Sequence, residues 1–171
     1  MKSIYLTGFM GAGKTSIGHA LGEKLGLSVF DTDSLIEDKA EKNISKFFEV
    51  YGEAEFRRLE KEVLQGLPVT DSIIMTGGGI IKTAENISWM KEKGLMIFLY
   101  CDMEIVLQRL AHDITRPLIQ QKSKEEITAL FSERLPLYQK AHITLDTSSL
   151  SVGEAALKLV DEIKSWHSGQ H

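Results

Sequence analysis

The fold is decided by one short stretch near the N-terminus: Gly8-Phe9-Met10-Gly11-Ala12-Gly13-Lys14-Thr15. This stretch matches the pattern G-x-x-x-x-G-K-[ST] at every fixed position. The apolar run Ile4–Thr7 precedes it, and an amphipathic stripe follows it, formed by Ile17, Leu21 and Leu25. The sequence therefore predicts a strand, a glycine-rich turn and a helix, in that order.

A turn of this kind is typical of a phosphate-binding loop. Its glycines let the backbone wrap around phosphate oxygens, and the helix that follows adds its positive N-terminal end. Lys14 is expected to place its charge on the β- and γ-phosphates of ATP, and the Thr15 hydroxyl to bind Mg²⁺. The alternative is a glycine-rich helix start that binds no ligand. The residues expected to contact the nucleotide here are Gly11, Ala12, Gly13, Lys14, Thr15 and Ser16.

Four further apolar runs define the rest of the predicted sheet: Leu27–Phe30, Ile73–Met75, Met96–Tyr100 and Ile143–Leu145. They are continuous rather than alternating, as in strands that are covered on both faces. Amphipathic stretches separate the runs, which predicts a parallel sheet with helices on both sides. We expect one three-layer α/β/α domain over residues 1–171. Two segments interrupt the alternation, a helical one at 33–67 and a polar one at 112–124, and these are expected to carry specificity and motion.

The bulk composition excludes several classes of function. The chain has 171 residues and a net charge of −4, with no block of Lys or Arg, so binding to nucleic acid or to an anionic membrane is not expected. No apolar run approaches the roughly 20 residues that a membrane span needs, and no secretory signal is evident. A monomer in the cytoplasm is expected. The single cysteine, Cys101, is expected to be buried at a strand end, the alternative being a reactive thiol.

Two carboxylates, Asp31 and Asp33, follow the second apolar run. Ligands of an open parallel sheet bind beyond the carboxyl ends of the strands, so both side chains are expected beside the phosphate-binding loop. Two negative charges there would repel phosphate unless a cation lay between, so Asp31 is expected to join Thr15 in a Mg²⁺ site. Asp33 is expected to orient an acceptor hydroxyl and take its proton. The alternative is that Thr32 or Asp33 caps the next helix.

Two arginines are candidates for holding an anionic acceptor, Arg57 and Arg134. Arginine binds planar carboxylates in a bidentate manner that lysine does not match. Glu60 lies three residues after Arg57 on the same helix face, where it can hold the guanidinium in place. Gly77–Gly79 follows the third apolar run, and its glycines allow close approach to a ligand. The alternatives are solvated surface arginines and a loop that only turns the chain.

The polar segment 112–124 carries Arg116, which is expected to close over the γ-phosphate, stabilise transition-state charge and exclude water. The alternative is an ordinary exposed loop. Arg109 ends the preceding helix, where it either complements the helix dipole or contacts adenine. The third run, Ile73–Met75, lacks the aspartate that often holds the metal in such proteins. The metal is therefore expected to rely on Thr15 and Asp31, on phosphate oxygens and on water.

Together these motifs resemble the shikimate kinase family over nearly the whole chain. Six motifs carry the resemblance. The phosphate-binding motif Gly8–Thr15 is shared by many nucleotide hydrolases and kinases, but the other five motifs, in the order in which they occur, are specific to this family. The resemblance implies a P-loop NTPase fold like that of nucleoside monophosphate kinases, with a five-stranded parallel sheet of order 2-3-1-4-5, a substrate-binding insertion and a mobile lid. The motifs are Gly8–Thr15, Asp31-Thr32-Asp33, Phe56-Arg57-x-x-Glu60, Gly77-Gly78-Gly79, Arg116-Pro117-Leu118 and Arg134-x-x-x-Tyr138.

The resemblance also implies an activity and a role for each matched residue. The reaction would be ATP- and Mg²⁺-dependent phosphorylation of the 3-hydroxyl of shikimate, on the route to chorismate and the aromatic amino acids. The catalytic residues would be Lys14, Asp33 and Arg116. The shikimate-binding residues would be Asp33, Arg57, Gly78, Gly79 and Arg134. Arg109 and Arg116 would add to the nucleotide-binding set, and Asp31 would lie just beyond the direct ligands of the metal bound by Thr15.

The sequence departs mildly from this family at two places. Ile119 stands where a second leucine is common, which is expected to alter packing and leave Arg116 in place. The segment 146–149 lacks the basic residue that some relatives carry on the adenine side. Two other functions remain alternatives at this point: another small-metabolite kinase of the same fold, such as one acting on gluconate, and a non-catalytic nucleotide-binding module.

Overall fold

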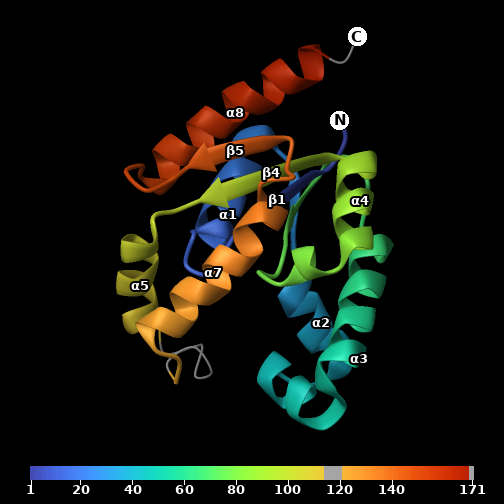
Figure 1. Cartoon of the computed structure of the whole chain (residues 1–171). Coiled ribbons are helices and arrows are strands. Elements are labelled where there is room, and N and C mark those ends of the chain that lie inside the picture. Colours follow the sequence, from blue (N-terminus) through green and yellow to red (C-terminus); the bar gives the residue numbers. More distant parts are fainter. Residues whose placement is uncertain (114–120, 170–171) are drawn as a thin grey trace.

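The computed structural model describes residues 1–113 and 121–169 and contains a five-stranded, all-parallel sheet (Figure 1). The strand order is β2-β3-β1-β4-β5, as the resemblance implied. Each strand begins or ends within one residue of the apolar run that predicted it. The strands are β1 (Ile4–Thr7), β2 (Ser28–Asp31), β3 (Ser72–Met75), β4 (Leu95–Tyr100) and β5 (Ile143–Asp146).

The register brings the carboxyl ends of the strands to one edge of the sheet. Leu6 of β1 lies opposite Met75 of β3 on one side and Ile97 of β4 on the other. All residues of β1 and β3 are buried, as expected for continuous apolar strands at the centre of a parallel sheet. The loops that follow β1, β2 and β3 therefore lie at the same edge of the sheet.

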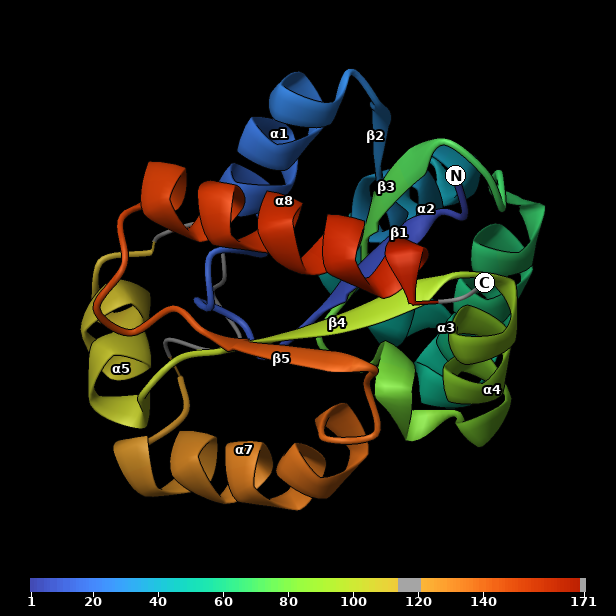
Figure 2. The ribbon, with the colours of Figure 1, turned by 90° about the horizontal axis from the view of Figure 1, so that it is seen from above.

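Helices cover both faces of the sheet, which confirms the three-layer prediction (Figure 2). Helices α1 and α8 lie side by side on one face, and α4 and α7 lie on the other (Figure 2). Helix α1 packs very close to the sheet, because a Cβ at Gly18 would lie only 2.3 Å from the Met75 sulfur. The helices are α1 (Lys14–Leu25), α2 (Thr32–Ala40), α3 (Ile44–Gly66), the 3₁₀ turn η1 (Ile80–Lys82), α4 (Ala84–Lys93), α5 (Met103–Ala111), α7 (Lys124–Tyr138) and α8 (Val152–Ser168).

The helical segment expected at 33–67 consists of two helices rather than one long stretch. Helix α2 ends at Ala40 and is followed by Glu41, which has φ 54°. Asn43 caps α3 by accepting a hydrogen bond from the Lys46 N–H at 2.7 Å. Helix α3 itself changes direction at Gly52, where φ is 80° and ψ is 173°. The two helices share a small core of their own, separate from the main one: Ile36, Phe47, Phe56 and Leu59.

The structure also bears on three smaller expectations. Cys101 is buried beyond the end of β4, and its environment raises the pKa of the thiol through burial, so the structural interpretation of this residue is confirmed. Helix α7 begins at Lys124, where the polar segment predicted at 112–124 ends, with the Ser123 hydroxyl accepting from the Glu126 N–H. Within residues 1–113 and 121–169, no helix is long and apolar enough to cross a membrane. Arg116 and Ile119 lie outside the described residues.

Candidate active site

The phosphate-binding loop lies between the end of β1 and the start of α1. The chain can make this turn because Gly13, directly before α1, adopts φ 91°, a conformation that residues with a side chain rarely take. The loop also passes very close to β4, since a Cβ at Gly8 would lie 2.7 Å from the Leu99 carbonyl oxygen. Glycines are thus required for two separate reasons, the shape of the loop and its approach to the sheet.

Two cationic side chains are bound to this loop. The Lys14 ammonium donates to the Gly8 carbonyl oxygen at 2.6 Å and to the Phe9 carbonyl oxygen at 3.1 Å. Arg109, from the last turn of α5, donates to the Gly11 carbonyl oxygen at 2.8 Å. The loop therefore has two positive charges within reach of any anion that it binds, in addition to the N-terminus of α1.

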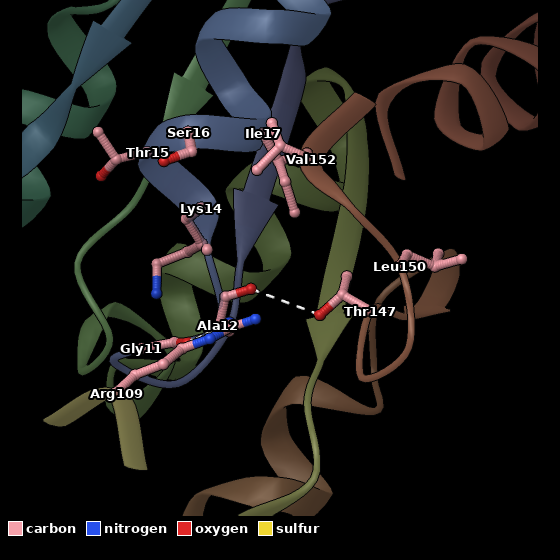
Figure 3. Close-up of a pocket in the computed structure, with 11 residues that line it drawn as sticks. Gly11, Ala12, Lys14, Thr15, Ser16, Ile17, Arg109, Thr147, Leu150 and Val152 are labelled. Atoms are coloured by element: carbon pink, nitrogen blue, oxygen red, sulfur yellow. Dashed lines mark hydrogen bonds between the residues drawn. The ribbon is translucent and has the colours of Figure 1, made fainter. Parts of the chain in front are cut away.

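A pocket of about 430 Å³ opens over the loop (Figure 3). Its lining includes every loop residue that the sequence predicted to contact a nucleotide, and Arg109 as well. It also includes a second segment, after β5, in which Thr147 belongs to the loop that the resemblance put on the adenine side, whereas Leu150 and Val152 were not predicted. The lining residues are Gly11, Ala12, Gly13, Lys14, Thr15, Ser16, Ile17, Arg109, Thr147, Leu150 and Val152.

Thr147 joins this second segment to the phosphate-binding loop. Its hydroxyl donates to the Tyr100 carbonyl oxygen at 3.0 Å and lies 3.5 Å from the Ala12 carbonyl oxygen (Figure 3). Leu150 and Val152 give this side of the pocket an apolar surface suited to a nucleotide base. A sequence signal for the segment exists, because it follows the last parallel strand and so lies at the ligand-binding edge of the sheet.

Asp31 is both the last residue of β2 and the cap of α2. Its Oδ1 accepts from the backbone N–H groups of Asp33 at 2.9 Å and Ser34 at 3.2 Å. The alternative interpretation, in which Thr32 or Asp33 caps this helix, is therefore wrong. The cap must have extended backbone angles, and Asp31 has them, with φ −114° and ψ 116°, whereas Thr32 already belongs to the helix.

Three charged side chains from three different helices meet at the glycine loop after β3. A Cβ at Gly77 would lie 2.4 Å from Oδ1 of Asp33, and a Cβ at Gly79 would lie 2.5 Å from Nη2 of Arg57. Arg134 reaches the same loop, with Nη1 3.5 Å from the Cβ position of Gly78. The structure thus brings Asp33 of α2, Arg57 of α3 and Arg134 of α7 close enough to contact one small molecule.

The predicted pairing of Arg57 with Glu60 is confirmed, with Nη1 2.9 Å from the Glu60 Oε1. Glu60 is only 1% exposed, and its burial raises the pKa of this carboxyl to about 7, although Arg57 works against the rise. On its other side, Arg57 has its Nε 3.5 Å from Glu53, which also accepts from Lys82 at 2.6 Å. Arg57 is therefore held by two carboxylates beside the glycine loop.

Arg134 packs against Phe9 and also interacts with Tyr138. Its guanidinium carbon lies 6.0 Å from the centre of the Phe9 ring, and its buried Nε finds no hydrogen-bond acceptor in the described part of the chain. A buried guanidinium donor without an acceptor is unusual, and it indicates a group that is completed by a ligand. One turn later on α7, the Tyr138 hydroxyl donates to the Gly78 carbonyl oxygen at 2.5 Å.

This fold and site define a class of protein: a P-loop kinase of the nucleoside monophosphate kinase type, with two arginines and an aspartate gathered at the glycine loop after β3. Comparison with known proteins places the chain more narrowly. It belongs to the shikimate kinase family, whose sequence model, described as "Shikimate kinase", matches residues 10–164.

Individual relatives agree with this assignment. The chain is 49% identical to a shikimate kinase of Bacillus cereus (strain AH187), covering 96% of this chain and 97% of the relative. It is 39% identical to a shikimate kinase of Caldicellulosiruptor bescii, covering 94% of each. Among solved structures, shikimate kinase from Acinetobacter baumannii in complex with shikimate superposes with a TM-score of 0.90 at 38% identity, covering 96% of this chain and 94% of the other. Shikimate kinase from Aquifex aeolicus gives a TM-score of 0.83 at 33% identity, with 95% and 96% covered.

Proposed function

We propose that this protein is a shikimate kinase, which transfers the γ-phosphoryl group of ATP to the 3-hydroxyl of shikimate and releases shikimate 3-phosphate and ADP. One observation carries the proposal: Asp33, Arg57 and Arg134 converge on a single glycine loop at the sheet edge that also holds the phosphate-binding loop. A ring acid with hydroxyl groups needs such an arrangement, with guanidinium groups at its carboxylate and a carboxylate at the reacting hydroxyl.

At the nucleotide end, the backbone of residues 11–16 and the Lys14 ammonium would bind the phosphates, and the pocket beside Arg109, Leu150 and Val152 would bind adenine. Mg²⁺ prefers hard oxygen ligands and keeps several waters, and the Thr15 hydroxyl and the Asp31 carboxylate, which ends β2, are oxygen donors of that kind. No group of three or more His, Cys, Asp or Glu side chains within residues 1–113 and 121–169 is arranged to hold a metal. A Mg²⁺ ion would therefore enter with the nucleotide, and it would neutralise charge on the phosphates.

At the acceptor end, Arg57 and Arg134 would hold the shikimate carboxylate, and Glu60 would keep Arg57 in place. The Gly78 and Gly79 main chain would contact the ring, and Asp33 would orient the 3-hydroxyl and take its proton as the oxygen bonds to the γ-phosphorus. The bond between that phosphorus and the bridging oxygen of ADP breaks in the same step. Catalysis would come mainly from holding the two substrates in line, because phosphoryl transfer needs little covalent participation from the protein.

The proposal also includes a role for Arg116, a cellular location, an oligomeric state and a choice between shikimate and gluconate. Arg116, in the lid segment 112–124, would stabilise the charge on the transferring phosphoryl group and help exclude water. A cytoplasmic location fits an enzyme that consumes ATP, and a monomer suffices because a single chain supplies every group invoked here. Shikimate is preferred to gluconate because both arginines, on separate helices, face the same loop, as a rigid ring carboxylate requires. A non-catalytic module would have no use for Asp33 beside a complete phosphate-binding loop.

The proposal is tested by measuring ADP release with shikimate, gluconate and nucleoside monophosphates as acceptors. We expect turnover with shikimate alone. Arg134→Ala should raise the shikimate KM by roughly thirtyfold or more, the equivalent of about 2 kcal/mol, and leave the ATP KM nearly unchanged, because only the carboxylate loses its partner.

Arg58→Ala provides a matched control for the loss of an arginine. Arg58 is adjacent to Arg57 in sequence, but its side chain is 59% exposed and pairs with Glu55 and Glu62 on the surface. This variant should keep both KM values. Equal rises in the shikimate and ATP KM values of Arg134→Ala would remove the carboxylate role, and turnover with gluconate instead of shikimate would overturn the proposed substrate.

A further inference from the structure

The glycine loop has no side chains of its own, and two buried hydroxyl groups from other elements hold its main chain. The Thr32 Oγ1 accepts a hydrogen bond from the Gly77 N–H at 3.1 Å. The Tyr138 hydroxyl donates to the Gly78 carbonyl oxygen at 2.5 Å. Both side chains have no exposed surface; the bond of Thr32 is fully buried and that of Tyr138 is partly buried. Consecutive residues of the loop are thus fixed from two sides, by α2 and by α7.

The bond from Tyr138 determines the direction of a donor on the next residue. In a trans peptide, the carbonyl of Gly78 and the N–H of Gly79 point in opposite directions, and the described residues contain no cis peptide bond. Gly79 is buried, yet its N–H has no hydrogen-bond acceptor in residues 1–113 and 121–169. Buried backbone donors are rarely left unpaired. This donor is therefore available to a ligand, and the orientation of its peptide depends on Tyr138.

Tyr138 is itself held rigidly. Its ring stacks on Phe98 of the buried strand β4, with ring centres 5.0 Å apart and planes inclined by 12°. Burial raises the pKa of its hydroxyl to about 12, so the group stays protonated and remains a donor at any physiological pH. Arg134 lies one turn earlier on α7, on the same helix face. Helix α7 thus presents a guanidinium and a hydroxyl to the same loop, at a spacing set by the helix.

We propose that Tyr138 and Thr32 are positioning residues of the acceptor site, which fix the peptide groups of Gly77–Gly79 in the orientation that the acceptor requires. Neither side chain is expected to touch the acceptor. Each acts through a main-chain group, Tyr138 through the Gly78 carbonyl and Thr32 through the Gly77 N–H. This inference rests on the proposed function and adds to it the residues that hold the glycine loop in place.

Tyr138→Phe tests the proposal, because it keeps the ring and its packing on Phe98 and removes one hydroxyl. The Gly78 carbonyl then lacks its donor, and the peptide is free to rotate. We expect the shikimate KM to rise by roughly five- to tenfold and kcat to fall, with the ATP KM unchanged, because one neutral hydrogen bond is lost at the acceptor side only. Isothermal titration with shikimate alone should show the same loss of affinity.

Tyr5→Phe is the matched control. Tyr5 is also a tyrosine with no exposed surface, but it lies on β1 beside Trp89, away from the glycine loop. Its removal tests what the loss of any buried hydroxyl does to this protein. We expect both KM values to stay at those of the wild type, whatever the change in thermal stability. If Tyr138→Phe also lowered only the unfolding temperature and left both KM values unchanged, Tyr138 would have a purely structural role.

Substitutions at Thr32 provide an independent test. Thr32→Ser keeps the oxygen that accepts from Gly77, whereas Thr32→Val keeps the shape and loses the oxygen. We expect Val to raise the shikimate KM severalfold and Ser to restore it to near the wild-type value. Equal KM values for the two variants would overturn the role of this hydroxyl. Wild-type protein inactive on shikimate would overturn the proposed function and this inference together, whereas an active wild type with an unaltered Tyr138→Phe would overturn the inference alone.

Discussion

Among single residues, Glu60 stands out because it is an almost fully buried carboxyl between several charged groups. Burial raises its pKa to about 7, the Asp33 carboxylate adds to the rise, and Arg57 and Arg134 oppose it. A pKa raised above the ordinary value of 4.5 means that the folded protein binds this proton more tightly than the unfolded chain does. The contribution of this carboxyl to stability is therefore fully present below about pH 4.5 and is lost as the pH rises through 7.

The same titration predicts a pH dependence of acceptor binding. Above pH 7, Glu60 is ionised, so it neutralises the charge of Arg57 and repels the shikimate carboxylate. Below pH 7, Glu60 is neutral, so the positive charge of Arg57 is balanced by the shikimate carboxylate instead. Binding of an anion beside Glu60 should raise its pKa further, so a proton is taken up with shikimate. We expect the shikimate KM, measured at saturating ATP, to fall by roughly threefold or more between pH 8 and pH 6.

Glu60→Gln should abolish this dependence, because glutamine keeps the shape and does not ionise. A variant that retained the wild-type slope would show that another group titrates. The sequence predicted the Arg57–Glu60 pair from a spacing of three on one helix face. It could not predict the protonation of Glu60, because the pKa depends on a burial of 99% that only the packing of other helices produces.

At the scale of elements, helix α3 bends at Gly52, within the helical insertion between β2 and β3. The residue has φ 80° and ψ 173°, a conformation open essentially to glycine alone. A Cβ at this position would meet nothing within 4 Å, so a substitution there changes only the backbone energy. We expect Gly52→Ala to lower the free energy of unfolding by about 1–3 kcal/mol.

Gly66→Ala is the control within the same helix. Its Cβ would also meet nothing within 4 Å, but Gly66 lacks the positive φ of Gly52, so alanine should be neutral or stabilise the protein by about 0.4–1 kcal/mol. Urea denaturation of the two variants beside the wild type measures the difference. Equal stabilities would mean that α3 straightens at no cost.

Elements differed in how well the sequence predicted them. The five strands were found because buried parallel strands are continuous apolar runs, and such runs are distinct from amphipathic helices. The end of α2 was missed because Glu41 stops it in a left-handed conformation with no glycine or proline to signal the break. Tertiary packing, and in particular the small core around Phe47 and Phe56, decides that boundary.

For the whole molecule, the proposed acceptor site is built from two packed units. Helices α2 and α3 have their own core, whereas α7 packs on the main core with the sheet. A single bound shikimate should therefore protect amides of α3 and α7 together from hydrogen exchange, and ADP should protect the start of α1. Arg134→Ala should remove the shikimate-dependent protection from both helices. If it persisted on α3 alone, Arg57 and Arg134 would bind separate ligands.

The sequence could not predict which residues far apart in the chain are in contact within the site. The residues at the ends of β1, β2 and β3 were placed correctly, because parallel strands bring their carboxyl ends to one edge. The contacts of Thr147 with Ala12 and of Tyr138 with Gly78 join residues 135 and 60 positions apart. No local pattern specifies such pairs, and only the assembled sheet and helices determine them.

The glycine loop has one more consequence, for how the specificity of this protein can change. Every residue except proline carries the same peptide N–H, so no point mutation at Gly77–Gly79 can give the loop a different donor. A Cβ at Gly77 would collide with Asp33, and one at Gly79 with Arg57. Altered acceptor preference must therefore arise from neighbours that tilt the peptide planes or from the charged groups opposite. Directed evolution toward a new acid would accordingly be best served by libraries that leave the three glycines untouched and vary the ring of residues around them.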